Sequence, residues 1–327
     1  MKRTLTLTLA VFLFAATASA ELKGSWTATT DDEKDGRIHL NINRGKFQNM
    51  GNNFNLSAFT GLSQAQIDSA TQVPVQFEMR REAGLVSFDG LFKNGDGAGH
   101  FTFTPNNSYA NTLRGLGVEL DLDKHGRNRT EEEELFTLAV HDVSTDFIRT
   151  MRAEGFNVSL EKYLSMRIFN VTPDYIREMR ALGYKDIGAE KLIETRIHRV
   201  TPDYIRRMRA AGWDLPLSQL VASRIHGATP EFAEQMRKLG YGDLDHDDLV
   251  AFRIHRVTPE FIEEMRKLGY DKVDADDLIA MRIHRVTPEF VKELEAAGYH
   301  KVPVDKLVAM RIHGVDAKFI KKMNDVD

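Results

Sequence analysis

The sequence of 327 residues contains no cysteine, which excludes disulfide bonds, thiol nucleophiles and thiolate metal ligands. An excess of charge of one sign is also missing, because 44 basic residues face 48 acidic ones and the formal net charge is -4. The two signs are mixed along the chain, so we do not expect a basic surface of the kind that binds nucleic acid. The chain must therefore fold by packing alone, and we expect no nucleic-acid partner and no cofactor.

Long apolar runs are missing after the first twenty residues, so no transmembrane segment is expected in the rest of the chain. Residues 1–20 have the parts of a secretory signal peptide: a basic start with Lys2 and Arg3, a mostly apolar run, and the small residues Ala18-Ser19-Ala20. A membrane anchor is the alternative, but this run is short for crossing a bilayer. We predict cleavage after residue 20 and a bacterial protein that is periplasmic or secreted.

Residues 21–105 show the alternation that is typical of β-strands. Val75, Phe77 and Met79 alternate with polar residues, and Gly95-Asp96-Gly97 separates two later segments of the same kind. Such alternation, bounded by Gly, Asn and Asp, predicts an antiparallel meander with one buried face. Phosphate-binding loops have similar glycine spacing, but here no helix follows the glycines, so we expect a hairpin turn.

Residues 106–135 are predicted to join this β-domain to the rest of the chain. Tyr109, Leu113 and Gly115 fit a degenerate half of the repeat that follows. The next stretch, residues 121–134, is charged and nearly free of apolar side chains. We expect it to form an exposed loop.

A unit of 28 to 29 residues recurs from about Val143 to the end of the chain. In a clear copy, Thr258-Pro259 supplies an N-cap and a first-turn proline, and Gly269 followed by Tyr270 supplies a helix stop. A second apolar segment near Asp274 completes the unit, which is therefore predicted to be two short helices. A fixed period of this length indicates stacked repeats, which usually form extended binding surfaces.

The fold class predicted from these patterns is α+β. Residues 21–105 are expected to form the N-terminal antiparallel β-domain. Residues 136–327 are expected to form an α-solenoid-like array of about six units with a C-terminal cap helix.

The repeat consensus is Val-Thr-Pro-acid-Phe-Ile, Met-Arg, Leu-Gly-Tyr, Leu-Ile-Ala and Arg-Ile-His, and it covers about residues 143–323. It resembles repeats of bacterial exported proteins and is similar to repeats in chains related to the membrane metalloprotease sensors of β-lactam resistance. The zinc motif and the membrane helices of those proteases are absent from this sequence. The resemblance therefore implies an accessory interaction region and no catalytic residues.

The second helix of most units ends in Arg-Ile-His. With Leu192 at 0°, a rotation of about 100° per residue places Arg196 at about 40°, Ile197 at about 140° and His198 at about 240°. The arginine is thus directed inward, where a charge needs a partner, and an acid lies seven residues further on in five of six units. We predict a structural ladder of Arg–carboxylate or Arg–carbonyl contacts between units, with a row of anion-binding arginines as the alternative. The ladder residues are Arg167, Arg196, Arg224, Arg253, Arg282 and Arg311.

The histidines of this motif are expected to lie at helix C-termini rather than to bind metal. Neighbouring helices are about 8–10 Å apart, whereas Zn–N bonds are about 2 Å, so adjacent units could not easily share an ion. His246, with three aspartates nearby, is the best remaining metal candidate, but we expect it to cap the next helix. Ser159-Leu160-Glu161-Lys162 fits the Ser-x-x-Lys nucleophile motif, but its companion motifs are absent and an N-cap is expected.

An aromatic residue follows the helix-ending glycine in most units, and these rings are the candidate partner-binding residues because tyrosine and tryptophan are half apolar. The alternative is that each ring only closes its own helix end. The candidates are Tyr184, Trp213, Tyr241, Tyr270 and Tyr299.

These patterns predict a non-enzymatic scaffold that binds a protein or peptide in the bacterial cell envelope. The alternative is a module that binds a small molecule or cell-wall glycan in the β-domain. An enzyme is the third hypothesis. The sequence does not define the oligomeric state.

Overall fold

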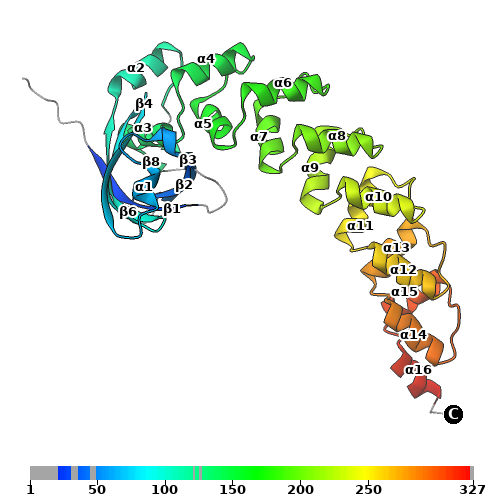
Figure 1. Ribbon diagram of the computed structural model, residues 1–327. Helices are drawn as coiled ribbons and strands as arrows, with labels where there is room; N and C mark the ends of the chain where they lie inside the picture. Colours follow the sequence, from blue (N-terminus) through cyan, green and yellow to red (C-terminus); the bar gives the residue numbers. More distant parts are fainter. Residues whose placement is uncertain (1–20, 31–35, 45–48, 121, 125–126, 325–327) are drawn as a thin grey trace, which may run out of the picture. The chain divides into compact units, whose positions relative to one another are not determined.

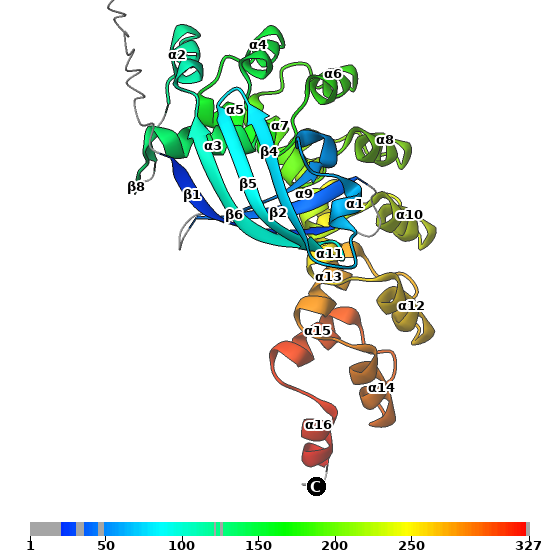
Figure 2. The same cartoon turned by 60° about the vertical axis from the view of Figure 1, so that its left-hand side comes forward.

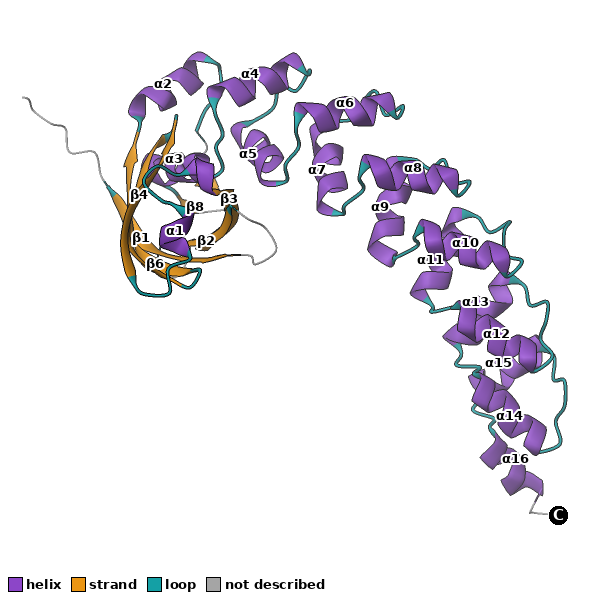
Figure 3. Cartoon of the chain, viewed as in Figure 1, coloured by secondary structure: helices purple, strands orange, loops and turns teal. Residues whose placement is uncertain are grey.

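The computed structural model describes residues 21–30, 36–44, 49–120, 122–124 and 127–324 (Figure 1). The predicted signal peptide lies outside the described residues. The chain forms two compact units, Met1–Ile168 and Phe169–Asp327. Strands are confined to the first unit and the second is helical (Figure 3), which confirms the predicted α+β class.

Six antiparallel strands form one sheet in the order β3-β2-β1-β6-β5-β4 (Figure 2). The strands are β1 Leu22–Thr30, β2 Arg37–Asn43, β3 Asn49–Asn55, β4 Val73–Arg81, β5 Gly84–Lys93 and β6 Asp96–Pro105. The sheet consists of two three-stranded meanders joined by the pairing of β1 with β6, instead of a single meander. Between β3 and β4 lie the 3-10 helix η2 (Leu56–Ala58) and helix α1 (Gln64–Ile67).

One face of the sheet is buried, as the alternation predicted. Trp26 is at its centre, with Phe77 at 5.4 Å and Phe92 at 5.5 Å between ring centres. The indole N–H donates to the carbonyls of Asp89 and His100, which lie beside the paired glycines 90 and 99. A Cβ at position 99 would lie 1.9 Å from the Asp89 carbonyl oxygen, so glycine is required where these strands meet the tryptophan.

The charged stretch before the array begins a buried helix. Thr130 and Glu133 form a capping box at the start of α3 (Glu131–Val140), and the Phe136 ring stacks on Phe101 at 5.2 Å. Glu134 is fully buried and pairs with Arg129 at 3.1 Å. The expected loop is therefore replaced in part by a helix, because the capping box and the apolar residues after Glu134 outweigh the local charge.

Helix α2 (Asn107–Gly115) and α3 form a complete helix pair. The Tyr109 hydroxyl donates to the carbonyl of Val143, the same type of contact that Tyr175 makes with Val200 in a later unit. The predicted half-repeat is thus a whole unit with a long connection, which contains the short strands β7 (Asp123–Lys124) and β8 (Arg127–Asn128). A further pair, α4 (Thr145–Ala153) and α5 (Leu160–Ile168), completes the first unit.

The second unit contains five helix pairs and a final helix. Their bounds are α6 Pro173–Ala181, α7 Ala189–Ile197, α8 Pro202–Ala210, α9 Leu217–His226, α10 Pro230–Lys238, α11 His246–Ile254, α12 Pro259–Lys267, α13 Ala275–Ile283, α14 Pro288–Ala296, α15 Val304–Ile312 and α16 Ala317–Asn324. In the described ranges, no helix combines the length and hydropathy needed to cross a membrane.

Local sequence explains the ends of these helices. At α12, the Thr258 hydroxyl accepts from the Phe261 amide at 3.3 Å, and Pro259 occupies the first turn. At the other end, Gly269 has a φ of 87° and the Tyr270 amide donates to the Met265 carbonyl. This is the Schellman stop that the sequence predicted. Figure 1 shows α7, α9 and α11 on the inner side of the curve followed by α6, α8 and α10.

Candidate partner-binding surface

The six ladder arginines each lie over an aromatic ring of their own unit. Their guanidinium carbons are 4.3 to 5.0 Å from the ring centres. In five of the six, Nε also donates to a carbonyl at the end of the preceding second helix, as in Arg196 to Phe169 at 3.0 Å. Helix C-termini leave such carbonyls without partners, so the arginine of the next unit satisfies them.

The carboxylate version of the predicted ladder is not formed at the expected acids. Among the described residues, Arg167 pairs at 2.6 Å with Asp142 and not with Asp174. Glu260 instead stays at the start of α12, where hydrogen bonds from its own backbone N–H and from Thr258 lower its pKa. The acids therefore serve helix N-termini, where the dipole favours them, while the arginines serve C-termini.

A second arginine ladder was not predicted. Arg209 donates to the Leu182 carbonyl at 2.8 Å, and Arg266 donates to the Leu239 carbonyl. These carbonyls lie at the C-caps of the preceding first helices. The Met-Arg pair that recurs near the end of α4, α6, α8, α10 and α12 was the sequence signal for this ladder.

One buried position of the repeats holds a polar pair in two successive units and an apolar pair in others. The Tyr175 hydroxyl donates to Thr195 at 2.9 Å, and both residues are buried. Tyr204 likewise faces Ser223, whose side chain interacts with the tyrosine hydroxyl. Units that have phenylalanine at this position have an apolar partner, as in Phe261 with Met281. In the units of Tyr175 and Tyr204, a second hydroxyl thus lies beside the tyrosine hydroxyl, which also reaches a backbone carbonyl.

His246 resembles the histidine of a catalytic triad, but its surroundings favour a structural role. Its Nε2 lies 3.0 Å from the Ser223 hydroxyl, and Nδ1 lies 3.0 Å from Asp247. The same Nε2 is also 3.0 Å from the carbonyl oxygen of Gln219, so a backbone acceptor competes with the serine hydroxyl for this nitrogen. Ser223 is also fully buried. The arrangement thus links α9 to α11, and no three metal-ligating side chains come together in the described part of the chain.

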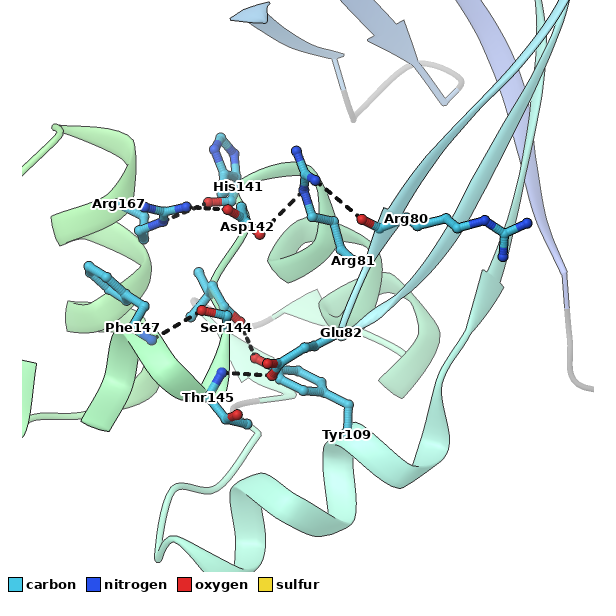
Figure 4. A network of polar contacts seen from close by, with 11 residues as sticks. Arg80, Arg81, Glu82, Tyr109, His141, Asp142, Ser144, Thr145, Phe147 and Arg167 are labelled. Atoms are coloured by element: carbon cyan, nitrogen blue, oxygen red, sulfur yellow. Dashed lines mark hydrogen bonds and ion pairs between the residues drawn. The ribbon is translucent and has the colours of Figure 1, made fainter. Parts of the chain in front are cut away.

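A polar network connects the β4–β5 turn to the first helices (Figure 4). Asp142 lies between Arg81, at 3.3 Å, and Arg167, at 2.6 Å. Glu82 accepts from the amide of Thr145 at 2.8 Å. His141 is largely withdrawn from water, and this burial, together with Arg167, lowers its pKa to about 4. The charges in this network are paired with each other or with the backbone, which favours a structural junction over a reactive site.

The aromatic rings that follow the helix-ending glycines pack between units. The hydroxyls of Tyr184, Tyr241 and Tyr270 donate to carbonyls of the following unit at 2.8 to 2.9 Å. These three rings and Trp213 are half-buried, whereas Tyr299 is 43% exposed. Four of the five candidates therefore contribute to packing between or within units, and Tyr299 presents the most open ring.

The exposed apolar side chains of the array include the isoleucines of the Arg-Ile-His motif. Each is 48–55% exposed, although the helical projection placed them near the apolar arc. They occupy the last turn of the second helices, where the neighbouring arginine stacks on a ring of its own unit and the isoleucine stays open. This isoleucine row consists of Ile197, Ile225, Ile254, Ile283 and Ile312.

Small residues border the isoleucine row. In α11, Asp247, Ala251 and Ile254 are spaced four and three residues apart, so they lie on one helix face. Alanine recurs at the middle position in α9, α13 and α15. The isoleucines therefore stand clear of their surroundings, with an acid at the start of most of these helices.

Arginines in an uncommon backbone conformation follow the isoleucine row. Arg199, Arg256 and Arg285 have φ values of 56°, 57° and 59° and are exposed. Gly227 and Gly314 occupy the same position in other units, with φ values of 74° and 69°. An open groove of about 500 Å³ lies at this edge, lined by arginines 253, 256 and 282 and glutamates 260, 264 and 289, among others.

Comparison of the chain with protein-family models, curated proteins and solved structures found no match. The candidate surface therefore depends on the geometry of the repeats themselves.

Proposed function

We propose that this protein is a non-enzymatic scaffold of the bacterial cell envelope, and that a peptide segment of a partner protein docks on the isoleucine row. The observation that supports the proposal is the recurrence of a half-exposed isoleucine at the same position in five successive second helices. Contiguous exposed apolar surface is typical of interaction sites. The signal-peptide pattern of residues 1–20 supports export to the envelope.

The size of each contact indicates how much of the row a partner must cover. Burying a whole isoleucine side chain contributes about 1.5–3 kcal/mol, so covering the exposed half of Ile254 contributes about 1 kcal/mol. Association itself costs at least about 4 kcal/mol. One isoleucine is therefore insufficient, and a partner has to span several units.

The β-domain has fewer features that a small molecule or glycan could bind. Its concave face is filled by Trp26 and the surrounding phenylalanines. An open groove of about 460 Å³ near Thr60, Gln76 and Asp89 remains at the polar side of the sheet. The phenylalanines that border it, Phe77 and Phe88, are buried and cannot stack on a sugar.

Crosslinking in the native envelope, followed by mass spectrometry, tests the proposal with the double variant Ile254→Ser/Ile283→Ser. We expect the variant to melt like the natural protein and to lose the partners that the natural protein crosslinks. Leu91→Ser is the matched control, because Leu91 is an apolar side chain of the sheet that is 43% exposed. An unchanged partner set in the isoleucine variant, or loss of partners in the Leu91 variant, would refute the assignment to this row.

A further inference from the structure

We infer that the segment bound by the isoleucine row is acidic: an extended peptide whose carboxylates pair with Arg256 and Arg285 while its apolar side chains cover Ile254 and Ile283. This inference rests on the proposed function and specifies the chemistry of the partner.

The backbone at Arg256 and Arg285 is the first support. Side chains other than glycine are disfavoured in the left-handed region, because Cβ comes too close to the following carbonyl oxygen. Glycine adopts the same left-handed conformation at positions 227 and 314, so the fold does not require arginine at this position of the repeat. The favourable effect of a cation near a helix C-terminus is small at an exposed site and does not fully offset the strain. Strained residues of this kind tend to occur at binding sites.

The second support is the lack of internal partners. In the described part of the chain, the guanidinium groups of Arg199, Arg256 and Arg285 form no hydrogen bond or ion pair. Arg282, by contrast, has two internal partners: it is stacked on Phe261 and donates to a carbonyl. Exposed cations without partners beside an apolar row can take carboxylates from another molecule.

The acids near the groove do not remove this preference. Glu260 and Glu289 line it, but both accept hydrogen bonds from their own backbone N–H groups and from the preceding threonines, which lowers their pKa values. Glu264 also lines the groove. Asp247 and Asp276 lie at the opposite ends of the second helices, a full helix length from Arg256 and Arg285. The groove is therefore lined by acids as well as arginines, and the cations that lack an internal partner in the described structure are Arg256 and Arg285, two residues after Ile254 and Ile283.

The spacing of the units defines the pattern of the peptide. Packed helices are about 8–10 Å apart, and an extended polyproline-II chain advances about 3.1 Å per residue and places every third side chain on the same side. Three residues therefore correspond to one unit. The matching sequence carries an apolar residue and a neighbouring carboxylate at every third position, with two carboxylates in register with α11 and α13.

Fluorescence anisotropy with labelled peptides of about twelve residues, enough for four units at this spacing, tests the inference. Three peptides share the same apolar positions and carry aspartate, asparagine or lysine beside them. We expect the purified full-length protein to bind the aspartate peptide most tightly, with affinity falling as salt is raised.

The decisive variant is Arg256→Gly/Arg285→Gly, which reproduces the glycine of positions 227 and 314. We expect it to melt at the same or a higher temperature and to bind the aspartate peptide about tenfold more weakly. Lys301→Gly is the matched control, because Lys301 is an exposed cation with a φ of 52° outside the row, and it should leave binding unchanged.

The outcomes separate this inference from the proposed function. Equal binding of the three peptides, unchanged binding by the arginine variant, or no binding of the aspartate peptide would overturn the acidic partner. The docking role of the row would still stand if Ile254→Ser/Ile283→Ser removed the crosslinked partners. If that variant kept them, the proposed function would fail.

Discussion

The guanidinium carbon of Arg282 lies 4.9 Å from the centre of the Phe261 ring, in the same repeat unit. The Nε of the same side chain donates at 3.3 Å to the carbonyl of His255, which belongs to the preceding unit. One arginine thus covers its own helix pair and caps the helix of its neighbour. This double contact links the two units, whereas the side chain of Ile283 beside it is 50% exposed.

Replacing Arg282 by alanine should lower the free energy of unfolding by about 1–2 kcal/mol. The loss combines a cation–π contact with a charged hydrogen bond to a carbonyl at a half-buried site. Denaturant melts measure the change. Arg285→Ala is the control, and it should remain within about 0.5 kcal/mol of the natural protein because its guanidinium has no partner among the described residues.

Arg253 provides a comparison with Arg282, because it has the ring contact without the carbonyl contact. Its side chain stacks on Phe232 at 4.8 Å but is exposed and forms no carbonyl bond in the described structure. Arg253→Ala should therefore cost less than Arg282→Ala. A larger cost at Arg253 would show that the carbonyl contact is not what couples the units.

The pair formed by Tyr175 and Thr195 should behave as one polar unit in a double-mutant cycle. Tyr175→Phe removes a hydrogen bond and should cost about 1 kcal/mol. Thr195→Met should cost about 1–3 kcal/mol, because the larger side chain is forced against the tyrosine hydroxyl. The double variant reproduces the Phe261 and Met281 pair of another unit, so it should be more stable than the sum of the single effects predicts. Purely additive losses would contradict this coupling.

The sequence was sufficient for the features that depend on one helix at a time. Thr258-Pro259 and Gly269 bracket α12 within a residue or two, because capping and chain reversal are local. The alternation around Phe77 likewise identified the buried face of the sheet.

Features that depend on the neighbouring unit could not be predicted in the same way. A helical projection places Ile254 near the apolar arc, but it does not show whether a neighbouring unit covers that side chain, which is 51% exposed. The capping box at Thr130 was visible in the sequence, yet the charge of residues 131–134 outweighed it in the prediction of a loop. The match of Tyr175 with Thr195 becomes visible only when the repeats are aligned with each other.

Stability should fall in mild acid through His141. Its pKa in the folded protein is about 4, below its ordinary value of 6.5, because burial and Arg167 disfavour the charged ring. Folding therefore favours the neutral form, and the contribution is complete above pH 6.5 and lost as pH falls from 6.5 towards 4. At pH 5 the loss is about 2 kcal/mol.

Other groups also titrate in this range, so the test compares the protein with His141→Gln. The difference in unfolding free energy between the two should shift by about 2 kcal/mol in favour of the variant from pH 7 to pH 5. Denaturant melts at both pH values measure it. A difference that stays constant would mean that the ring is not held in its neutral form.

The tyrosines that follow the glycines distinguish a packing role from a binding role. The Tyr270 hydroxyl donates to the Val302 carbonyl at 2.8 Å, and its pKa is raised mainly by burial. Tyr270→Phe should therefore lower the unfolding free energy by about 0.5–1.5 kcal/mol. Tyr299→Phe is the matched control, because this ring is 43% exposed and its hydroxyl forms no hydrogen bond among the described residues, so its melt should not change.

Partner crosslinking with the same two variants completes the comparison. If the rings serve packing, both variants keep the partners of the natural protein, and only Tyr270→Phe melts earlier. If the rings bind the partner through their hydroxyls, Tyr299→Phe should lose crosslinks, because its hydroxyl is the one free to reach another molecule. Loss of partners at Tyr299, with the isoleucine variant unaffected, would move the binding surface from the ends of the second helices to the connections that follow the first helices.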